Sequence, residues 1–134
     1  YGPFDANQRV LYKFITRALN GQPLRIDGDG SMALDFTYVD DTANGIFRIA
    51  TTDAAAGETF NIARGKSETL STAVSIISET IGDVEVEYGE VPDHIPNRGT
   101  LDVTKAREML GFEPQYGLEQ ALPAYIDHLR HNPF

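Results

Sequence analysis

The chain has 134 residues, the size of one domain or of a piece of one. Its 41% hydrophobic and 23% charged residues are typical of a globular protein and exclude an intrinsically disordered chain. The formal net charge of −9 disfavours nucleic-acid binding, and the absence of cysteine excludes disulfides and thiolate metal sites. No apolar run approaches the roughly 18 residues of a membrane helix, and no signal-like N-terminus is present. We therefore expect no membrane contact and a cytoplasmic location.

The spacing of apolar residues predicts helices and strands in an irregular order. Helices are expected over 7–20, 41–52, 70–81, 104–110 and 118–129, and strands over 24–27, 36–39, 59–63 and 84–88. Residues 91–100 carry two prolines and a glycine and are predicted to form a loop. Pro123 lies beyond the first turn of the last helix, so we expect it to bend that helix or to move its start to Leu122.

The stretch from Gly28 to Asp41 is the centre of this pattern. Asp29-Gly30 favours a tight turn, because glycine readily adopts a positive φ. Asp40 and Asp41 then stand where the N-cap of a helix is expected. The apolar residues of that helix share one stripe: Ala43, Ile46, Phe47 and Ala50.

Five motifs in order resemble one family. They are Tyr1-Gly2-Pro3; Gly21-Gln22-Pro23-Leu24-Arg25-Ile26; Gly28-Asp29-Gly30 with Asp35-Phe36-Thr37-Tyr38-Val39-Asp40-Asp41; Phe60-Asn61-Ile62; and Asp102-Val103-Thr104-Lys105-Ala106 followed by Leu110-Gly111-Phe112-Glu113-Pro114. Together they resemble the C-terminal half of extended short-chain dehydrogenase/reductases, the NAD-dependent sugar-nucleotide epimerases and dehydratases. The resemblance covers nearly all 134 residues.

The resemblance implies an α/β fold: the small C-terminal substrate-binding portion of the enzyme, without its Rossmann sheet. We therefore interpret 1–134 as a single partial domain, and we expect a fragment because the chain begins inside a mid-chain motif of the family. NAD(P) would be bound by the missing half. The parent reaction would be NAD-linked oxidation at a sugar carbon, then epimerisation, elimination or decarboxylation, then reduction.

The residues of this chain predict no catalytic, cofactor or metal site. The glycines Gly28 and Gly30 precede a second strand, whereas a nucleotide loop precedes a helix. The family's Tyr-x-x-x-Lys pair does not occur, nor does a Gly-x-Ser-x-Gly nucleophile elbow. Asp27-x-Asp29-x-Ser31 is not followed by the glycine and glutamate of a calcium loop. His128-x-x-His131 is interpreted as cationic residues at a helix end.

By the resemblance, the predicted site binds a nucleotide sugar. The strand residues Arg25, Ile26 and Asp27 would lie against the base, and Gln8 and Arg9 would border the same cleft. Leu34 stands where many members carry a diphosphate-binding arginine. A second family arginine falls near Val91-Pro92, so Arg98 and Arg25 are the candidates to replace both, unless they are ordinary surface residues.

A different class of function is a stand-alone binding or oligomerisation module derived from this half. For either function we predict self-association through the surface left by the missing half. The strand around Phe60-Asn61-Ile62 would expose unpaired backbone groups beside apolar side chains, and such edges recruit other strands.

Overall fold

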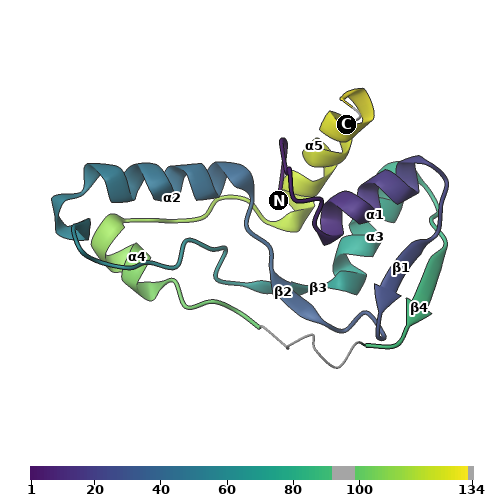
Figure 1. Cartoon of the computed structure of the whole chain (residues 1–134), viewed down its shortest axis with the longest axis horizontal. Helices are drawn as coiled ribbons and strands as arrows, with labels where there is room; N and C mark the ends of the chain where they lie inside the picture. The colour runs from purple at the N-terminus through teal and green to yellow at the C-terminus, as the bar shows by residue number, and fades with distance from the viewer. Residues whose placement is uncertain (92–98, 133–134) are drawn as a thin grey trace.

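The computed structural model describes residues 1–91 and 99–132 and has a mixed α/β fold. Figure 1 shows an elongated molecule with α2 (Val39–Thr51) and α4 (Thr104–Leu110) at one end. At the other end lie α1 (Val10–Leu19), α3 (Leu70–Ile81), β1 (Leu24–Asp27) and β4 (Val86–Gly89). The strands β2 (Ala33–Asp35) and β3 (Ser67–Thr69) join the two ends, and a short 3-10 helix, η1 (Asp53–Ala55), follows α2.

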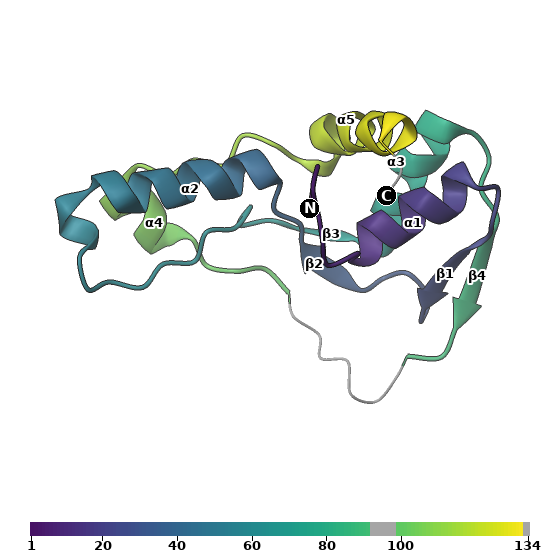
Figure 2. The ribbon, with the colours of Figure 1, turned by 45° about the horizontal axis from the view of Figure 1, so that its top comes forward.

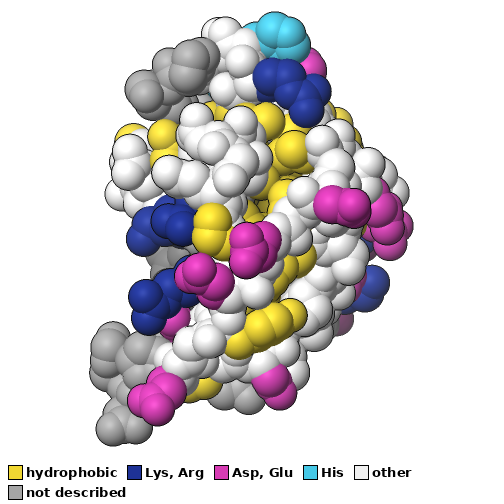
Figure 3. Space-filling view, turned by 90° about the vertical axis from the view of Figure 1, so that its right-hand side faces the viewer, with side chains coloured by type: hydrophobic (Ala, Val, Ile, Leu, Met, Phe, Trp, Pro, Cys, Tyr) yellow, Lys and Arg dark blue, Asp and Glu magenta, His cyan; other side chains and the backbone are white. Residues whose placement is uncertain are grey.

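The larger hydrophobic core lies between three helices and β1. In Figure 2, α5 (Leu118–His131) lies across α1 and α3. The two strands β1 and β4 pair in parallel, with Leu24 opposite Val86 and Asp27 opposite Gly89. Thirteen described residues of this core are at most 5% exposed: Leu11, Phe14, Ile15, Leu24, Ile26, Leu70, Ala73, Ile77, Leu118, Leu122, Tyr125, Ile126 and Leu129. On the face shown in Figure 3, at the β1 and β4 end, charged side chains of both signs border apolar ones.

A smaller core lies beneath α2. It is formed by Ala55, Ala106, Leu110 and Phe112, with Phe60 and Ile62 packed against it. Gly45 is buried on the inner side of α2, where a Cβ would overlap the Ile62 side chain. The opposite side of α2 is open: the side chains of Ile46 and Phe47 are 60% and 65% exposed.

The helices over 70–81 and 104–110 have the predicted bounds. The Thr69 hydroxyl accepts a hydrogen bond from the Thr72 N–H at the start of α3 (3.0 Å). Gly111 has a left-handed φ of 59° at the end of α4. The strand predicted over 24–27 is confirmed as β1, and the one over 84–88 appears as β4, which is shifted toward the C-terminus.

Two local predictions were wrong, and one of the two effects expected of Pro123, a shifted helix start, did not occur. The first helix begins at Val10 rather than at 7, because Gln8 has a φ of 46° and turns the chain before the helix. Pro123 lies inside α5 without moving its start, which stays at Leu118, where the Gln120 side chain accepts the Gly117 N–H (2.8 Å). Tyr38, rather than Asp40 or Asp41, is the N-cap of α2.

The strands also differ from prediction at two places. The strand after the central turn is Ala33–Asp35 rather than 36–39, and it pairs antiparallel with Ser67–Thr69, which had not been predicted as a strand. Residues 59–63 form no strand pairing with any other described residue. Most of the loop predicted over 91–100 lies outside the described residues. Within 1–91 and 99–132, no helix is both long and apolar enough to cross a membrane.

Candidate functional site

A cleft of about 940 Å³ opens between the start of α1, the strand β2 and the segments that pass beneath α2. Its size is within the roughly 300–1,000 Å³ typical of small-molecule sites. Hydrophobic and hydroxyl side chains form most of its wall. The lining residues are Tyr1, Arg9, Val10, Leu11, Leu34, Asp35, Phe36, Thr37, Thr42, Ile62, Ala63, Gly99 and Leu101.

The Asp35 carboxylate connects β2 to two other segments of the cleft wall. Its Oδ1 accepts the backbone N–H of Arg64 (2.9 Å), and its Oδ2 accepts those of Gly65 (3.0 Å) and Leu101 (3.2 Å). Hydrogen bonds to an ionised carboxylate are stronger than neutral ones. These bonds occupy the Asp35 carboxylate, so its role is to hold the wall of the cleft together.

Tyr1 forms an aromatic corner of the cleft. Its ring packs against Phe36, Tyr38 and Tyr125 with centroid distances of 6.4, 5.4 and 6.3 Å. The hydroxyl donates to the Gly117 carbonyl (3.3 Å). Burial raises the pKa of the Tyr1 phenol far above its ordinary value, and the neighbouring Tyr38 adds to the effect. The phenol is therefore neutral at physiological pH.

Arg9 is the cationic side chain in the described lining. It occupies the N-cap of α1, where no side chain of a described residue caps the helix. The exposed guanidinium makes no ion pair with a residue of 1–91 or 99–132. The positive end of the helix dipole adds to this charge, so an anionic group is favoured at this end of the cleft.

The predicted site residues are divided between two places. Arg9 and Leu34 line the cleft, and the exposed Gln8 directly precedes Arg9 without lining it. Arg25 and Asp27 lie in β1 outside the cleft, with an Nε–Oδ1 distance of 3.8 Å between them.

The other two predicted residues offer no side-chain contact to a ligand in the described structure. The Ile26 side chain is 1% exposed and belongs to the core, so only its backbone is available. Arg98 lies outside the described residues. The Leu34 side chain is apolar, but its backbone forms a bridge with Gly99 and keeps the two sides of the cleft together.

Asp35 and Asp41 are structural residues whose partners the sequence did not reveal. Turn and cap roles were expected for the aspartates around the central turn, and Asp29 has one: its carboxylate accepts the Ser31 N–H (2.9 Å). Asp41 instead accepts the backbone N–H groups of Gln115 (2.8 Å) and Tyr116 (3.0 Å). Their place in the Asp-Phe-x-Tyr-Val-Asp-Asp motif was the available signal, but it did not name the partners.

Comparison with known proteins identifies this arrangement. Residues 1–63 match the NAD dependent epimerase/dehydratase family. The structure superposes with a TM-score of 0.91 and 26% identity on UDP-glucuronic acid 4-epimerase from Bacillus cereus, solved in complex with UDP-glucuronic acid and NAD. The chain is thus similar to the NAD-dependent epimerase/dehydratase family. The resemblance and the α/β fold class predicted from the sequence are thereby confirmed.

Other members of the family show similar agreement. The chain is 30% identical over 137 residues to UDP-glucuronic acid decarboxylase 4 of Arabidopsis thaliana. It matches UDP-glucose 4-epimerase of Thermotoga maritima, solved with UDP-glucose, with a TM-score of 0.89 and 31% identity. The match covers 98 to 100% of this chain but only 30% of the plant enzyme and 42 to 43% of the two epimerases.

Proposed function

We propose that this chain is the substrate-binding portion of an NAD-dependent epimerase/dehydratase that acts on a nucleoside diphosphate sugar. The observation that carries the proposal is the cleft, where an apolar wall meets the guanidinium of Arg9, which has no ion-pair partner within 1–91 and 99–132. Such a site suits a ligand with an anionic group at one end and a sugar or base at the other. Relatives solved with UDP-glucuronic acid and with UDP-glucose support a UDP-sugar as the ligand.

Binding of UDP to the full-length protein tests this proposal. Arg9→Ala should weaken binding by about 1.5–3 kcal/mol, the range for a hydrogen bond to a charged group. Leu34→Arg should strengthen it, because a guanidinium replaces an apolar side chain in the lining. Arg130→Ala removes an exposed charge on α5 outside the cleft and is the matched control. Equal UDP affinity in all of these proteins would overturn a diphosphate substrate.

Two further substitutions test the residues predicted from the sequence outside the described cleft. If Arg98 and Arg25 replace the family arginines, Arg98→Ala and Arg25→Ala should each weaken UDP binding. An effect of Arg25→Ala would show that β1 contributes to the site although its side chains lie outside the cleft. If neither variant changes the UDP affinity, both residues are ordinary surface arginines.

The nicotinamide cofactor belongs to the same proposal. NAD(P) would be bound by a half of the enzyme that this chain does not contain, so the chain alone should bind no NAD and catalyse no reaction. Supporting this, Gly28 and Gly30 lead into β2 rather than into a helix that could hold pyrophosphate. Calorimetry of the 134-residue chain with NAD at about 1 mM, a weak-binding concentration, is the test. Saturable one-to-one binding would overturn it.

The reaction type follows from the products. Epimerisation preserves the mass of the UDP-sugar, elimination removes water, and decarboxylation releases carbon dioxide. After incubation of the full-length protein with UDP-glucose and with UDP-glucuronic acid, mass spectrometry therefore identifies elimination and decarboxylation. Chromatography before the mass spectrometer separates an epimer from unreacted substrate of the same mass. Unchanged substrate in the presence of NAD, with UDP bound normally, would favour a binding module.

The cytoplasmic location stays a prediction that cell fractionation tests.

Self-association is the second part of the proposal, and the open side of α2 favours it. The exposed apolar stripe comprises Val39, Ala43, Ile46, Phe47 and Ala50. Next to α2, the backbone of residues 59–63 has no strand partner among the described residues. An apolar stripe and an unpaired edge together favour association of separate chains. This association would also underlie the alternative of an oligomerisation module.

Sedimentation at several concentrations in about 0.15 M salt, where charge repulsion is screened, tests the association. The 134-residue chain should form dimers or larger species, and Phe47→Ser should shift it toward the monomer. Tyr88→Ser, which removes a similarly exposed aromatic ring on β4, is the control. A single monomeric species for the unmodified chain would overturn the proposal.

A further inference from the structure

Three buried polar atoms lie where the N-terminal segment crosses α5, outside the cleft. They are Asp5 Oδ2, Tyr125 Oη and His128 Nε2, and none has a hydrogen-bond partner among the described residues. An unpaired buried polar group costs about 1–3 kcal/mol, so such groups are rare unless they pair with one another or serve a purpose.

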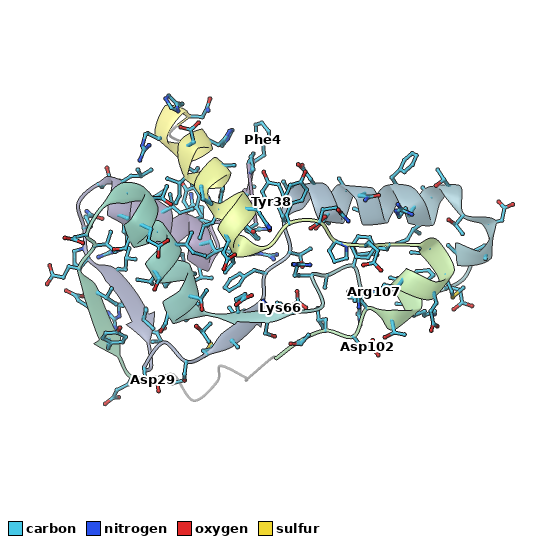
Figure 4. All side chains as sticks on the ribbon, turned by 180° about the vertical axis from the view of Figure 1, so that it is seen from behind. Phe4, Asp29, Tyr38, Lys66, Asp102 and Arg107 are labelled. Carbon is cyan, nitrogen blue, oxygen red and sulfur yellow. The ribbon has the colours of Figure 1, made fainter. Side chains whose placement is uncertain are left out.

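Independent contacts show that the three side chains are neighbours. Tyr125 and His128 are three residues apart on α5 and therefore lie on the same side of the helix. The ring of Phe4, the residue before Asp5, contacts the His128 ring edge-on with a centroid distance of 5.4 Å. Burial raises the pKa of the Tyr125 phenol, and the negative charge of Asp5 raises it further, as does Tyr12 of α1. Figure 4 shows Phe4 projecting outward beside α5.

The segment that carries Asp5 has a strained backbone. Phe4 and Gln8 have φ values of 67° and 46°, a left-handed conformation that costs non-glycine residues about 1–3 kcal/mol each. The Phe4 side chain is 79% exposed, so its burial offsets little of that cost. Such strain persists only where surrounding contacts hold it. The segment ends at Arg9, so whatever holds it also sets the position of the guanidinium in the cleft.

We propose that Asp5, Tyr125 and His128 form a buried lock that positions Arg9. In this lock a buried water connects the three groups: it accepts hydrogen bonds from the Tyr125 hydroxyl and the His128 Nε2–H and donates one to Asp5 Oδ2. The chemistry is complementary, because a phenol and an imidazole N–H each donate one hydrogen bond while a carboxylate oxygen accepts. All three are positioning residues. The effect on ligand binding rests on the proposed function, whereas the effect on the segment does not.

Hydrogen exchange and ligand binding, both measured on the full-length protein, test the lock. Tyr125→Phe and His128→Leu should each increase amide exchange over residues 4–9 by about tenfold, which corresponds to roughly 1.4 kcal/mol. Each should weaken UDP binding by a similar factor and leave NAD affinity unchanged. His128→Gln keeps an N–H donor, so its amide exchange over residues 4–9 and its UDP affinity should stay close to those of the unmodified protein. His131→Leu, at an exposed histidine on the same helix, is the control and should change neither.

The outcomes separate the lock from the proposed function. Unchanged exchange over 4–9 in Tyr125→Phe and His128→Leu overturns the lock, whatever happens to UDP. Faster exchange with unchanged UDP affinity overturns the positioning of Arg9 and leaves the proposed function intact. If the unmodified protein binds no UDP, the proposed function fails, and the exchange measurement alone supports or overturns the lock.

Discussion

Replacement of Asp41 by asparagine is the sharpest test of how this fold is held together. The Asp41 side chain is 1% exposed, and its two oxygens accept the backbone N–H groups of Gln115 and Tyr116 at 2.8 and 3.0 Å. Because those partners follow 74 and 75 residues later, this one carboxylate ties the start of α2 to the segment that leads into α5. Asparagine has almost the same shape but only one acceptor oxygen, so its amide N–H must face one of the two backbone donors.

The expected loss of stability follows from that geometry. Asp41→Asn removes one charge-assisted hydrogen bond and leaves a buried N–H without an acceptor, which costs about 1.5–3 kcal/mol. With an urea m-value of about 2 kcal/mol per molar, typical of small proteins, the unfolding midpoint should fall by roughly 1 M. Asp40→Asn is the matched control, because Asp40 is exposed in the same first turn of α2. An exposed substitution should cost no more than about 0.5 kcal/mol.

Urea unfolding and amide exchange together measure the effect. In Asp41→Asn the amides of Gln115 and Tyr116 should lose protection, while Asp40→Asn should keep it. The claim that these hydrogen bonds stabilise the fold would be refuted by equal urea midpoints for the two variants. It would also be refuted if both amides stayed protected in Asp41→Asn.

Two other predictions concern the α2 packing and the acid side of the stability curve. Gly45→Ala should not raise the free energy of unfolding by the roughly 1 kcal/mol by which alanine favours a helix over glycine, because its Cβ would overlap Ile62. In an Ile62→Ala background the same change should become stabilising. A stabilising effect in both backgrounds would refute the close contact. The Thr104 N–H donates a hydrogen bond to the Asp102 carboxylate and lowers the pKa of that carboxyl. The stabilisation by this hydrogen bond is therefore complete above the unfolded-state pKa of about 3.9, and it is lost as the pH falls through the lower pKa of the folded state. Asp102→Asn should therefore weaken the acid dependence of the unfolding midpoint below about pH 4, and an identical pH curve would contradict it.

The cleft shows what could be inferred about the site before the structure was known. Arg9 and Leu34 were predicted on the family pattern, and both line the cleft. The partners of Asp35 were not predicted: its carboxylate accepts the backbone N–H groups of Arg64, Gly65 and Leu101. An aspartate in the sequence predicts a hydrogen-bond acceptor, but it does not predict which distant segment will supply the donors.

The sequence by itself determined the family and the local elements. Five motifs in order identified the family, and apolar spacing predicted the helices over 70–81 and 104–110 at their observed bounds. Both signals are local, since a helix satisfies its own backbone hydrogen bonds within four residues.

Only the tertiary structure decided the strand pairing after the central turn and the partners of the two anchoring aspartates. A strand needs a partner, and β2 finds it in β3, more than thirty residues later, whereas residues 59–63 find none in the described chain. The residues expected to form a strand after the central turn are instead held by Tyr1, whose nitrogen donates to Thr37 O (2.7 Å) and whose carbonyl accepts the Val39 N–H (2.9 Å). Backbone groups without a local partner take whichever distant group the packed chain brings within reach, and no sequence window contains that information.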